Sequence, residues 1–211
     1  MNILKPQNLN INELNKESLC NIRNEEKIEY CILEEEVYEN IDLYDVGFEH
    51  CVFSKINMQN AKLEKAAFRD VIFEQCNFSN TEFLESSFIR CEFKSCKLSG
   101  CGFIENRLYN NAFIDTNASY INFSMSNIEN TLYKEAGLQN SYFQENKIKN
   151  IYFNNADLSQ AKFFKTSLKE VDLSSSKIEG IAISIDDIKG ATIDGLQAID
   201  LLYLIGVKVK F

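Results

Sequence analysis

The sequence predicts an all-β solenoid, a chain that winds around its own core in short repeated coils. Every fifth residue from Leu43 to Ile193 is large and apolar, except for a weak position at Ala118, and this phase holds 14 of the 16 Phe. Two places before the large residue, 22 of the 31 units carry Ala, Cys, Ser, Thr or Val. Residues two apart on an extended segment point to the same side, so both positions are expected to face inward, with a turn in each unit.

The period divides the chain into three parts. Residues 1–27 precede it and are expected to form an N-terminal arm or cap, in which "INELNKESL" is either a short helix or a disordered arm. Residues 28–193 form the solenoid, and residues 194–211 form a C-terminal element. A solenoid needs such ends, because its last coils otherwise expose core and unpaired strand edges.

The C-terminal element reads as a capping helix followed by a short strand. Thr192 or Asp194 is placed to cap a helix that runs to about Ile205, Gly206 to end it, and the alternating "VKVKF" to form the strand. The helix is apolar on nearly every side, so it needs two contacts. One side covers the last coil, and the other is expected to meet a second copy in a homodimer, or else the chain's own tail. The expected dimer residues are Leu196, Ile199, Leu202, Tyr203 and Ile205.

Candidate catalytic and metal residues do not form a recognisable site. Six of the seven Cys stand at the small inward position and are interpreted as reduced core residues: Cys31, Cys51, Cys76, Cys91, Cys96 and Cys101. Cys91, Cys96 and Cys101 are spaced by five residues, which is not a zinc spacing. His50 is alone at an outward position. We therefore expect no enzyme activity, no cofactor and no metal, since a core filled with Phe and Leu leaves no cavity for chemistry.

Charge and hydropathy limit the partners. The formal net charge of −9 argues against direct nucleic-acid binding, which needs an excess of Lys and Arg. No apolar run approaches the roughly 20 residues that span a bilayer, and the first residues lack the pattern of a secretory signal. The expected location is the cytoplasm, away from membranes.

The units "CNFSN" (residues 76–80) and "NADLSQAKF" (residues 155–163) resemble the consensus of the pentapeptide-repeat family. This resemblance implies a right-handed quadrilateral β-helix with four units per coil and roughly eight coils. The tail "QAIDLLYLIG" and the acidic segment before residue 43 are similar to those of the Qnr-type quinolone-resistance proteins, especially the forms from Gram-positive bacteria. That likeness implies a homodimer joined through the C-terminal helix, which imitates DNA and binds type II topoisomerase, gyrase or topoisomerase IV.

A 20-residue coil would sort the outward side chains into columns. One face is expected to be acidic and to bind the partner, through Asp42, Asp45, Glu64, Glu82, Glu85 and Glu105. The next face is expected to be basic, through Arg69, Arg90, Arg107, Lys147, Lys149 and Lys169. The alternative function is a non-catalytic scaffold with an unrelated partner, bound through outward apolar residues. These are Val52, Ile72, Leu132 and Tyr152 in one column, and Leu84, Ile89, Ile104, Tyr109 and Ile114 in mid-rod.

Overall fold

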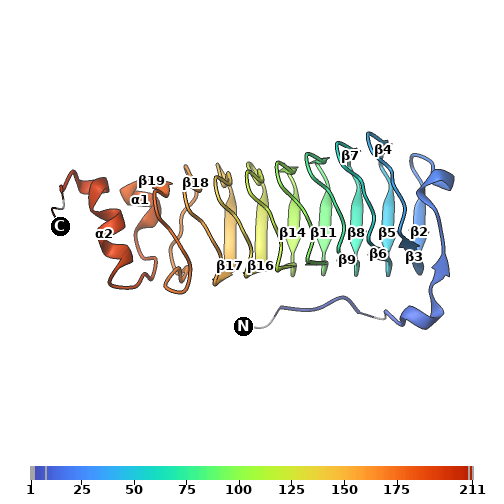
Figure 1. Ribbon diagram of the computed structural model, residues 1–211, viewed down its shortest axis with the longest axis horizontal. Coiled ribbons are helices and arrows are strands. Elements are labelled where there is room, and N and C mark those ends of the chain that lie inside the picture. The colour runs from blue at the N-terminus through green and yellow to red at the C-terminus, as the bar shows by residue number, and fades with distance from the viewer. Residues whose placement is uncertain (1–2, 8, 209, 211) are drawn as a thin grey trace.

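The structure is a computed structural model that describes residues 3–7, 9–208 and 210. The chain forms a parallel β-solenoid of about eight turns with a short helix at its C-terminal end (Figure 1). Each turn takes 20 residues, because Phe48 pairs in register with Phe68 and Phe53 with Phe73. Four five-residue units therefore give four faces. We name them A, B, C and D after the units of Leu43, Phe48, Phe53 and Met58.

Short strands stack along three of the four faces. Face A carries β4 (Asp42–Tyr44), β7 (Lys62–Glu64), β10 (Glu82–Leu84), β13 (Gly102–Ile104), β18 (Lys162–Phe163) and β19 (Ala182–Ile183). Face B carries β2 (Lys27–Glu29), β5 (Gly47–Glu49), β8 (Ala67–Arg69), β11 (Ser87–Ile89) and β14 (Arg107–Tyr109). Face C carries β1 (Asn15–Lys16), β3 (Cys31–Glu34), β6 (Val52–Ser54), β9 (Ile72–Glu74), β12 (Glu92–Lys94) and β15 (Ala112–Ile114). β16 (Asn127–Lys134) and β17 (Lys147–Asn154) run across the corner between faces B and C, and face D is joined by isolated bridges such as Asn57 to Asn77.

The corners have a uniform backbone conformation. Every fifth residue from Glu25 to Glu170 has a positive φ, between 50° and 70°, and all of these except Gly100 carry a side chain. This left-handed conformation turns the chain at the second residue after each large one. It is unfavourable for most residues and least so for Gly and Asn. The sequence predicted an outward residue here but not its backbone conformation.

The core confirms the expected inward positions. Large residues of successive coils stack in columns, such as Phe93 on Phe113 with ring centroids 4.7 Å apart, and Phe113 on Tyr133 at 5.0 Å. Both rings of each pair are parallel to within 10°. Tyr133 is fully buried and its hydroxyl oxygen has no hydrogen-bond partner among the described residues.

The small inward position has a second role that volume alone does not explain. The Ser86 N–H donates to Asn106 Oδ1 of the next coil (2.7 Å), and Asn106 Nδ2 donates to the Phe83 carbonyl (3.1 Å). Asn106 N–H in turn donates to Ser126 Oγ (2.9 Å). Since each coil turns at this point, the backbone N–H would otherwise be buried without a partner. Polar side chains in this column therefore join the coils.

The N-terminal residues close the first coil. Residues Ile11–Glu13 and Leu19–Asn21 form single 3₁₀ turns (η1 and η2), and β1 between them pairs with β3. The Leu19 side chain, 1% exposed, covers the end of the core, and the Leu19 N–H donates to the Tyr38 hydroxyl at 3.0 Å. Within "INELNKESL" (residues 11–19), the structure has a 3₁₀ turn at Ile11–Glu13 and a short strand at Asn15–Lys16.

The C-terminal end contains three short helices. One turn, α1 (Ile185–Ile188), replaces strand structure inside the expected solenoid, and α2 (Gln197–Leu201) continues into η3 (Leu202–Ile205). Gly206 ends the helix in the left-handed conformation, as expected. The expected terminal strand is absent from residues 207, 208 and 210, where no neighbouring strand pairs with the chain, and residues 209 and 211 lie outside the described residues. None of the described helices is long and apolar enough to cross a bilayer.

Candidate interaction surfaces

The expected acidic residues come together on face A. β4, β7, β10 and β13 form one sheet and carry or adjoin all six carboxylates. Five of the six are exposed, and Glu64 is half-buried. Successive strands of a sheet lie about 4.8 Å apart, so these carboxylates occupy four coils along the rod.

Two lysines lie within the acidic columns. Lys62 pairs in register with Asp42 on one side and Glu82 on the other. Lys65 donates to the Tyr44 hydroxyl at 3.0 Å. With six carboxylates and two ammonium groups, the net charge of residues 42–45, 62–65, 82–85 and 102–105 is 2 − 6 = −4. The half of this surface that contains Glu82, Glu85 and Glu105 has no basic residue.

Three of the six residues of the expected basic face, Arg69, Arg90 and Lys149, form ion pairs with carboxylates. Arg90 Nε and Nη2 donate to Oδ1 and Oδ2 of Asp70, each at 2.6 Å. Lys149 lies 3.2 Å from Glu129, and the Arg69 guanidinium lies 3.9 Å from a Glu49 carboxylate oxygen. Each of these residues lies in the column predicted from its position in the repeat. The sequence could not show these partners, because each lies 20 residues away on the neighbouring coil.

The apolar column expected on face C is not an open surface. Val52 and Leu132 are buried, at 4% and 8% exposure, and Ile72 and Tyr152 are half-buried. The mid-rod residues are also less exposed than expected, because only Leu84 is exposed, at 37%, and Ile89, Ile104, Tyr109 and Ile114 are half-buried. Position in an outward column therefore does not by itself make a residue accessible.

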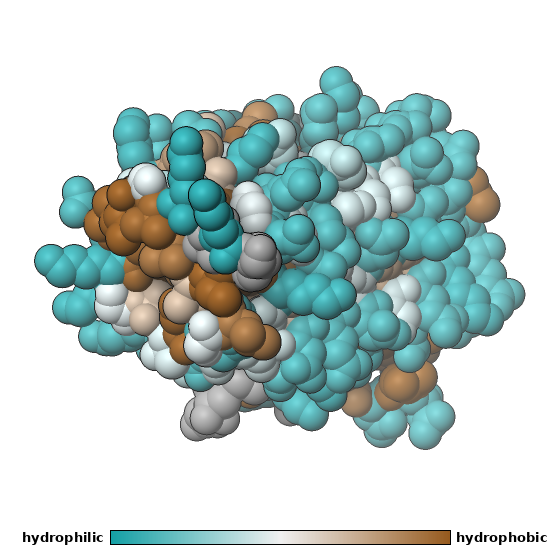
Figure 2. Space-filling model, turned by 60° about the vertical axis from the view of Figure 1, so that its left-hand side comes forward, coloured by the Kyte–Doolittle hydropathy of each residue, from teal (hydrophilic) through white to brown (hydrophobic). Residues whose placement is uncertain are grey.

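The C-terminal helix carries the most exposed apolar surface. Figure 2 shows apolar side chains gathered at this end of the rod. Leu196 is 79% exposed, Ile205 64%, Tyr203 49% and Ile199 38%, whereas Leu202 is half-buried. Four of the five expected dimer residues are thus open to solvent in the single chain.

Polar groups fix this helix on the last coil. Asp194 Oδ1 accepts the N–H groups of Leu196 and Gln197 (2.6 and 3.0 Å), and Gln197 Oε1 accepts the Asp194 N–H (2.9 Å). This reciprocal pair is a capping box. Gln197 is 6% exposed, and its Nε2 also donates to the Leu173 and Ser176 carbonyls. The helix is therefore anchored by its polar side and presents apolar residues outward.

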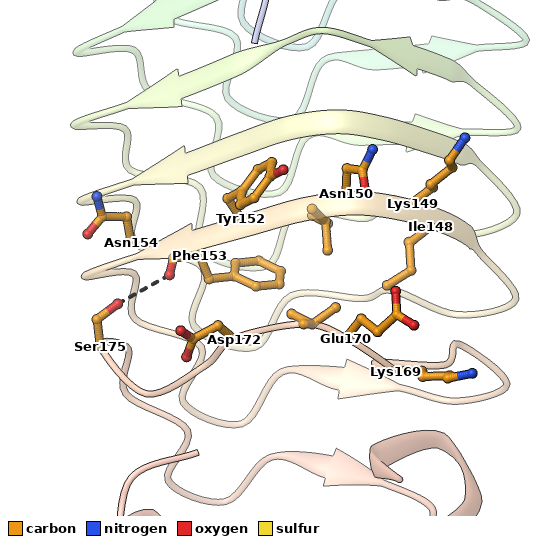
Figure 3. A pocket seen from close by; sticks show the side chains of 12 residues that line it. Ile148, Lys149, Asn150, Tyr152, Phe153, Asn154, Lys169, Glu170, Asp172 and Ser175 are labelled. Carbon is orange, nitrogen blue, oxygen red and sulfur yellow. Dashed lines mark hydrogen bonds between the residues drawn. The ribbon is translucent and has the colours of Figure 1, made fainter. Parts of the chain in front are cut away.

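A hollow of about 480 Å³ lies between β17 and residues 169–175 of the next coil, where the strand ladder is interrupted (Figure 3). β17 pairs with β16 but with no strand that follows it among the described residues. Instead, Ser175 Oγ donates to the Phe153 carbonyl at 3.3 Å and accepts the Asn155 N–H. The hollow is lined by residues of both charges, including Lys149, Lys169, Glu170 and Asp172, but by no His or Cys.

The cysteines take the core positions expected of them. The six in-phase Cys are buried and unbridged, and Cys20 is exposed. Cys76 Sγ donates to the Phe53 carbonyl at 3.3 Å, as Ser and Thr do elsewhere in the same positions. Within residues 3–7, 9–208 and 210, no cluster of His, Cys, Asp and Glu is arranged to hold a metal ion.

Comparisons with known proteins agree with the repeat. A family model described as a pentapeptide repeat region matches residues 66–131 and 86–163, and one described as pentapeptide repeats (8 copies) matches residues 41–80. No curated protein matches the chain.

Solved structures of repeat proteins are also similar to it. A trypsin-treated QnrB1, a plasmid-mediated fluoroquinolone resistance protein, is 24% identical, with 93% of this chain and 95% of that chain covered and a TM-score of 0.44. HetL from the cyanobacterium Nostoc sp. strain PCC 7120, a pentapeptide repeat protein involved in heterocyst differentiation regulation, is 14% identical, with 81% and 90% covered and a TM-score of 0.44. Likenesses this low carry no argument about function, and they give no support to the expected Gram-positive origin. The two family models together span residues 41–163, more than half of the 211 residues, and the chain therefore belongs to the pentapeptide-repeat family.

Proposed function

We propose that this protein is a non-catalytic DNA mimic. In this proposal a dimeric rod occupies the DNA-binding surface of a type II topoisomerase, gyrase or topoisomerase IV. The observation that carries it is the row of exposed carboxylates on face A. Fixed carboxylates along a stiff rod present an ordered negative potential to a basic surface without any ordering of flexible chain on binding.

The charge density of face A determines how tightly the rod should bind a DNA-binding surface. A net charge of −4 over four coils is about one charge per 4.8 Å, whereas duplex DNA carries one per about 1.7 Å. The rod therefore has about a third of the axial charge density of DNA. Its binding should be weaker than that of DNA and should weaken further as salt is added, because exposed charges are screened.

The exposed apolar surface on α2 and η3 supports the homodimer. Leu196 and Ile205 would leave water if two copies met through this surface, at roughly 25 cal/mol per Å² of apolar area buried. A two-fold contact uses the same surface twice, so it also closes the association at two chains. The dimer would double the length of the rod and carry two acidic faces.

A supercoiling assay tests the topoisomerase target. Purified gyrase is titrated with the protein, with and without ciprofloxacin. The proposal expects inhibition, or relief of the drug block, at micromolar protein. The double variant Glu82→Lys/Glu85→Lys should lose this effect. Its matched control is Glu74→Lys/Glu135→Lys, the same charge change on the opposite face C, which should keep it. No effect of the unaltered protein up to tens of micromolar would refute the target.

Leu84 favours a second candidate, the scaffold that binds an unrelated partner. Its side chain is exposed and lies on face A beside Glu82 and Glu85, so an apolar contact could form on the same surface. In that case Leu84→Ser should weaken binding more than the two charge reversals do. The interaction should then be insensitive to salt.

Sedimentation velocity tests the dimer separately. The protein should sediment as a dimer, and Leu196→Glu/Ile205→Glu should sediment as a monomer, because two buried carboxylates would lack partners. Ile11→Glu, at an apolar residue of the N-terminal end that is 59% exposed, is the control and should remain dimeric. A wild-type protein that is monomeric at tens of micromolar would contradict the proposal.

A further inference from the structure

The first residues of the chain run back along the rod instead of adding another coil. They follow the corner between faces B and C, opposite to the direction in which the coils progress (Figure 1). Leu4 N–H contacts Asn110 Oδ1 at 3.4 Å, and Gln7 lies two coils nearer the N-terminal end, at Asp70. We call residues 3–7, 9 and 10 the arm. Its direction crosses the strands, so it cannot extend their ladder and its main chain must be held by side chains.

The corner supplies those side chains from one column. His50, Asp70, Arg90 and Asn110 all occupy the left-handed corner position of face B, 20 residues apart, and we call them the corner track. Asp70 Oδ1 accepts the Gln7 N–H at 2.9 Å, and His50 Nδ1 donates to the Gln7 carbonyl at 3.0 Å. Both main-chain groups of one residue are therefore bound, as a neighbouring β-strand would bind them.

Contacts within the rod, separate from those with the arm, hold two members of the corner track. Asp70 is held by two hydrogen bonds from Arg90, and the His50 ring stacks on Tyr30 with centroids 4.9 Å apart. With the arm in place, His50, which the sequence predicted to be exposed, is 9% exposed, and Asp70 and Asn110 are 1% and 2% exposed. A preorganised polar site of this kind loses little side-chain entropy when it binds.

The arm leaves one hydrogen-bond donor of the corner track without a partner. Asn110 Nδ2 is buried and has no hydrogen-bond partner among the described residues, although its amide can serve an N–H and a carbonyl at once. Leu4, Lys5 and Gln7 are exposed, and the hydrogen bonds from the track go to main-chain atoms of the arm and not to its side chains. Pro6, the only proline of the chain, favours the extended conformation that this contact requires.

We propose that the corner track is a binding site for the main chain of an extended peptide, and that the arm is an internal occupant which a segment of a partner protein displaces. The partner segment is defined by its extended backbone. It offers a paired N–H and carbonyl to Asp70 and His50, and a second pair to Asn110. The few apolar contacts of the arm allow exchange, since Leu4 remains 43% exposed.

Fluorescence anisotropy with a labelled peptide of residues 1–12 tests this site. The protein is compared as the full chain and as a chain lacking residues 1–9, which keeps β1 and the cap. The shortened chain should bind the peptide. The full chain should bind it at least about tenfold more weakly, because a tethered arm competes at an effective concentration in the millimolar range. No binding to the shortened chain at millimolar peptide, or equal binding to both chains, would overturn the proposal.

Modified peptides test the main-chain contact without altering the protein. N-methylation of Gln7 removes the N–H that Asp70 accepts and should weaken binding by roughly tenfold or more, as expected for a hydrogen bond to a charged group. The control is N-methylation of Lys5, whose N–H makes no hydrogen bond among the described residues. Gln7→Ala in the peptide should change binding by less than about threefold, within the range of a weak exposed contact. Unchanged binding of the N-methyl Gln7 peptide, or a large loss with Gln7→Ala, would show that side chains carry the recognition and would overturn the proposal.

Discussion

Replacement of Tyr133 by Phe should stabilise the protein. The Tyr133 ring stacks between Phe113 and Phe153, with centroids 5.0 and 5.2 Å away, and is fully buried. Its hydroxyl oxygen has no hydrogen-bond partner among the described residues, and burial raises the pKa of the phenol well above its usual value. Phe keeps the ring and the stacking and removes only the unpaired oxygen.

Two opposing contributions give the expected size of the effect. An unsatisfied buried hydroxyl costs about 1–3 kcal/mol. Loss of one oxygen leaves a void of roughly 10–15 Å³, which at about 24 cal/mol per Å³ costs roughly 0.3 kcal/mol. The free energy of unfolding should therefore rise by about 0.7–2.7 kcal/mol. For a chain of this size each kcal/mol raises Tm by about 2–4 °C.

Urea unfolding of Tyr133→Phe measures this difference. The midpoint should rise with an unchanged slope, and far-UV circular dichroism and tyrosine fluorescence should give coincident transitions. Tyr109→Phe is the control, because Tyr109 is half-buried on the outer surface and should change stability by less than about 0.5 kcal/mol. A Tyr133→Phe protein that is equally stable or less stable would mean that the hydroxyl has a partner, such as a buried water, and would refute the reasoning.

Three further changes test other parts of the structure. Asn106→Ala should lower the free energy of unfolding by about 2–4 kcal/mol in urea, since it leaves the Ser86 N–H and the Phe83 carbonyl unpaired. Gln197→Ala should cost about 1–3 kcal/mol by the same measurement and loosen α2, because two carbonyls of the last coil lose their donor. Burial raises the pKa of Asp70, but hydrogen bonds from a guanidinium and a backbone N–H outweigh this and hold the pKa below its usual value. Because this pKa is lowered on folding, Asp70 stabilises the folded protein above about pH 4, and the stabilisation is lost as the pH falls through the lowered pKa. The backbone amide NMR signal of Gln7 should therefore shift below about pH 4, and Asp70→Asn should abolish that titration.

The period of five made the core predictable from the sequence. It placed Phe93 and Phe113 in one inward column and Cys76 among the small residues of the wall, and the structure confirms both. This worked because the inward positions follow local rules: a large residue fills the centre, and a residue two places earlier points the same way. The inward direction of a residue depends only on its position within its own five-residue unit, so it can be predicted without knowing which distant residues are its neighbours.

The surface was less predictable because it depends on neighbours that are far away in sequence. The column of Arg90 could be read from its phase, but its pairing with Asp70 depends on the stacking of coils. The burial of His50 depends on the arm, whose course no periodic signal indicates. Leu19, which closes the first coil, also lies outside the repeat.

Because the repeat has no insertions, the number of coils sets the length of the rod, and the number of five-residue units sets the face on which each later side chain lies. Removal of a whole 20-residue coil would shorten the rod by about 4.8 Å and leave every later side chain on its original face. Removal of a single five-residue unit would keep the core filled but rotate everything beyond it by a quarter turn. The angle between the carboxylates of face A and the C-terminal helix is therefore set by the number of units between them, and deletions or insertions in the middle of the rod would change it in steps of 90°. Families of such rods can vary their reach in whole coils and their orientation in single units, without redesign of either end.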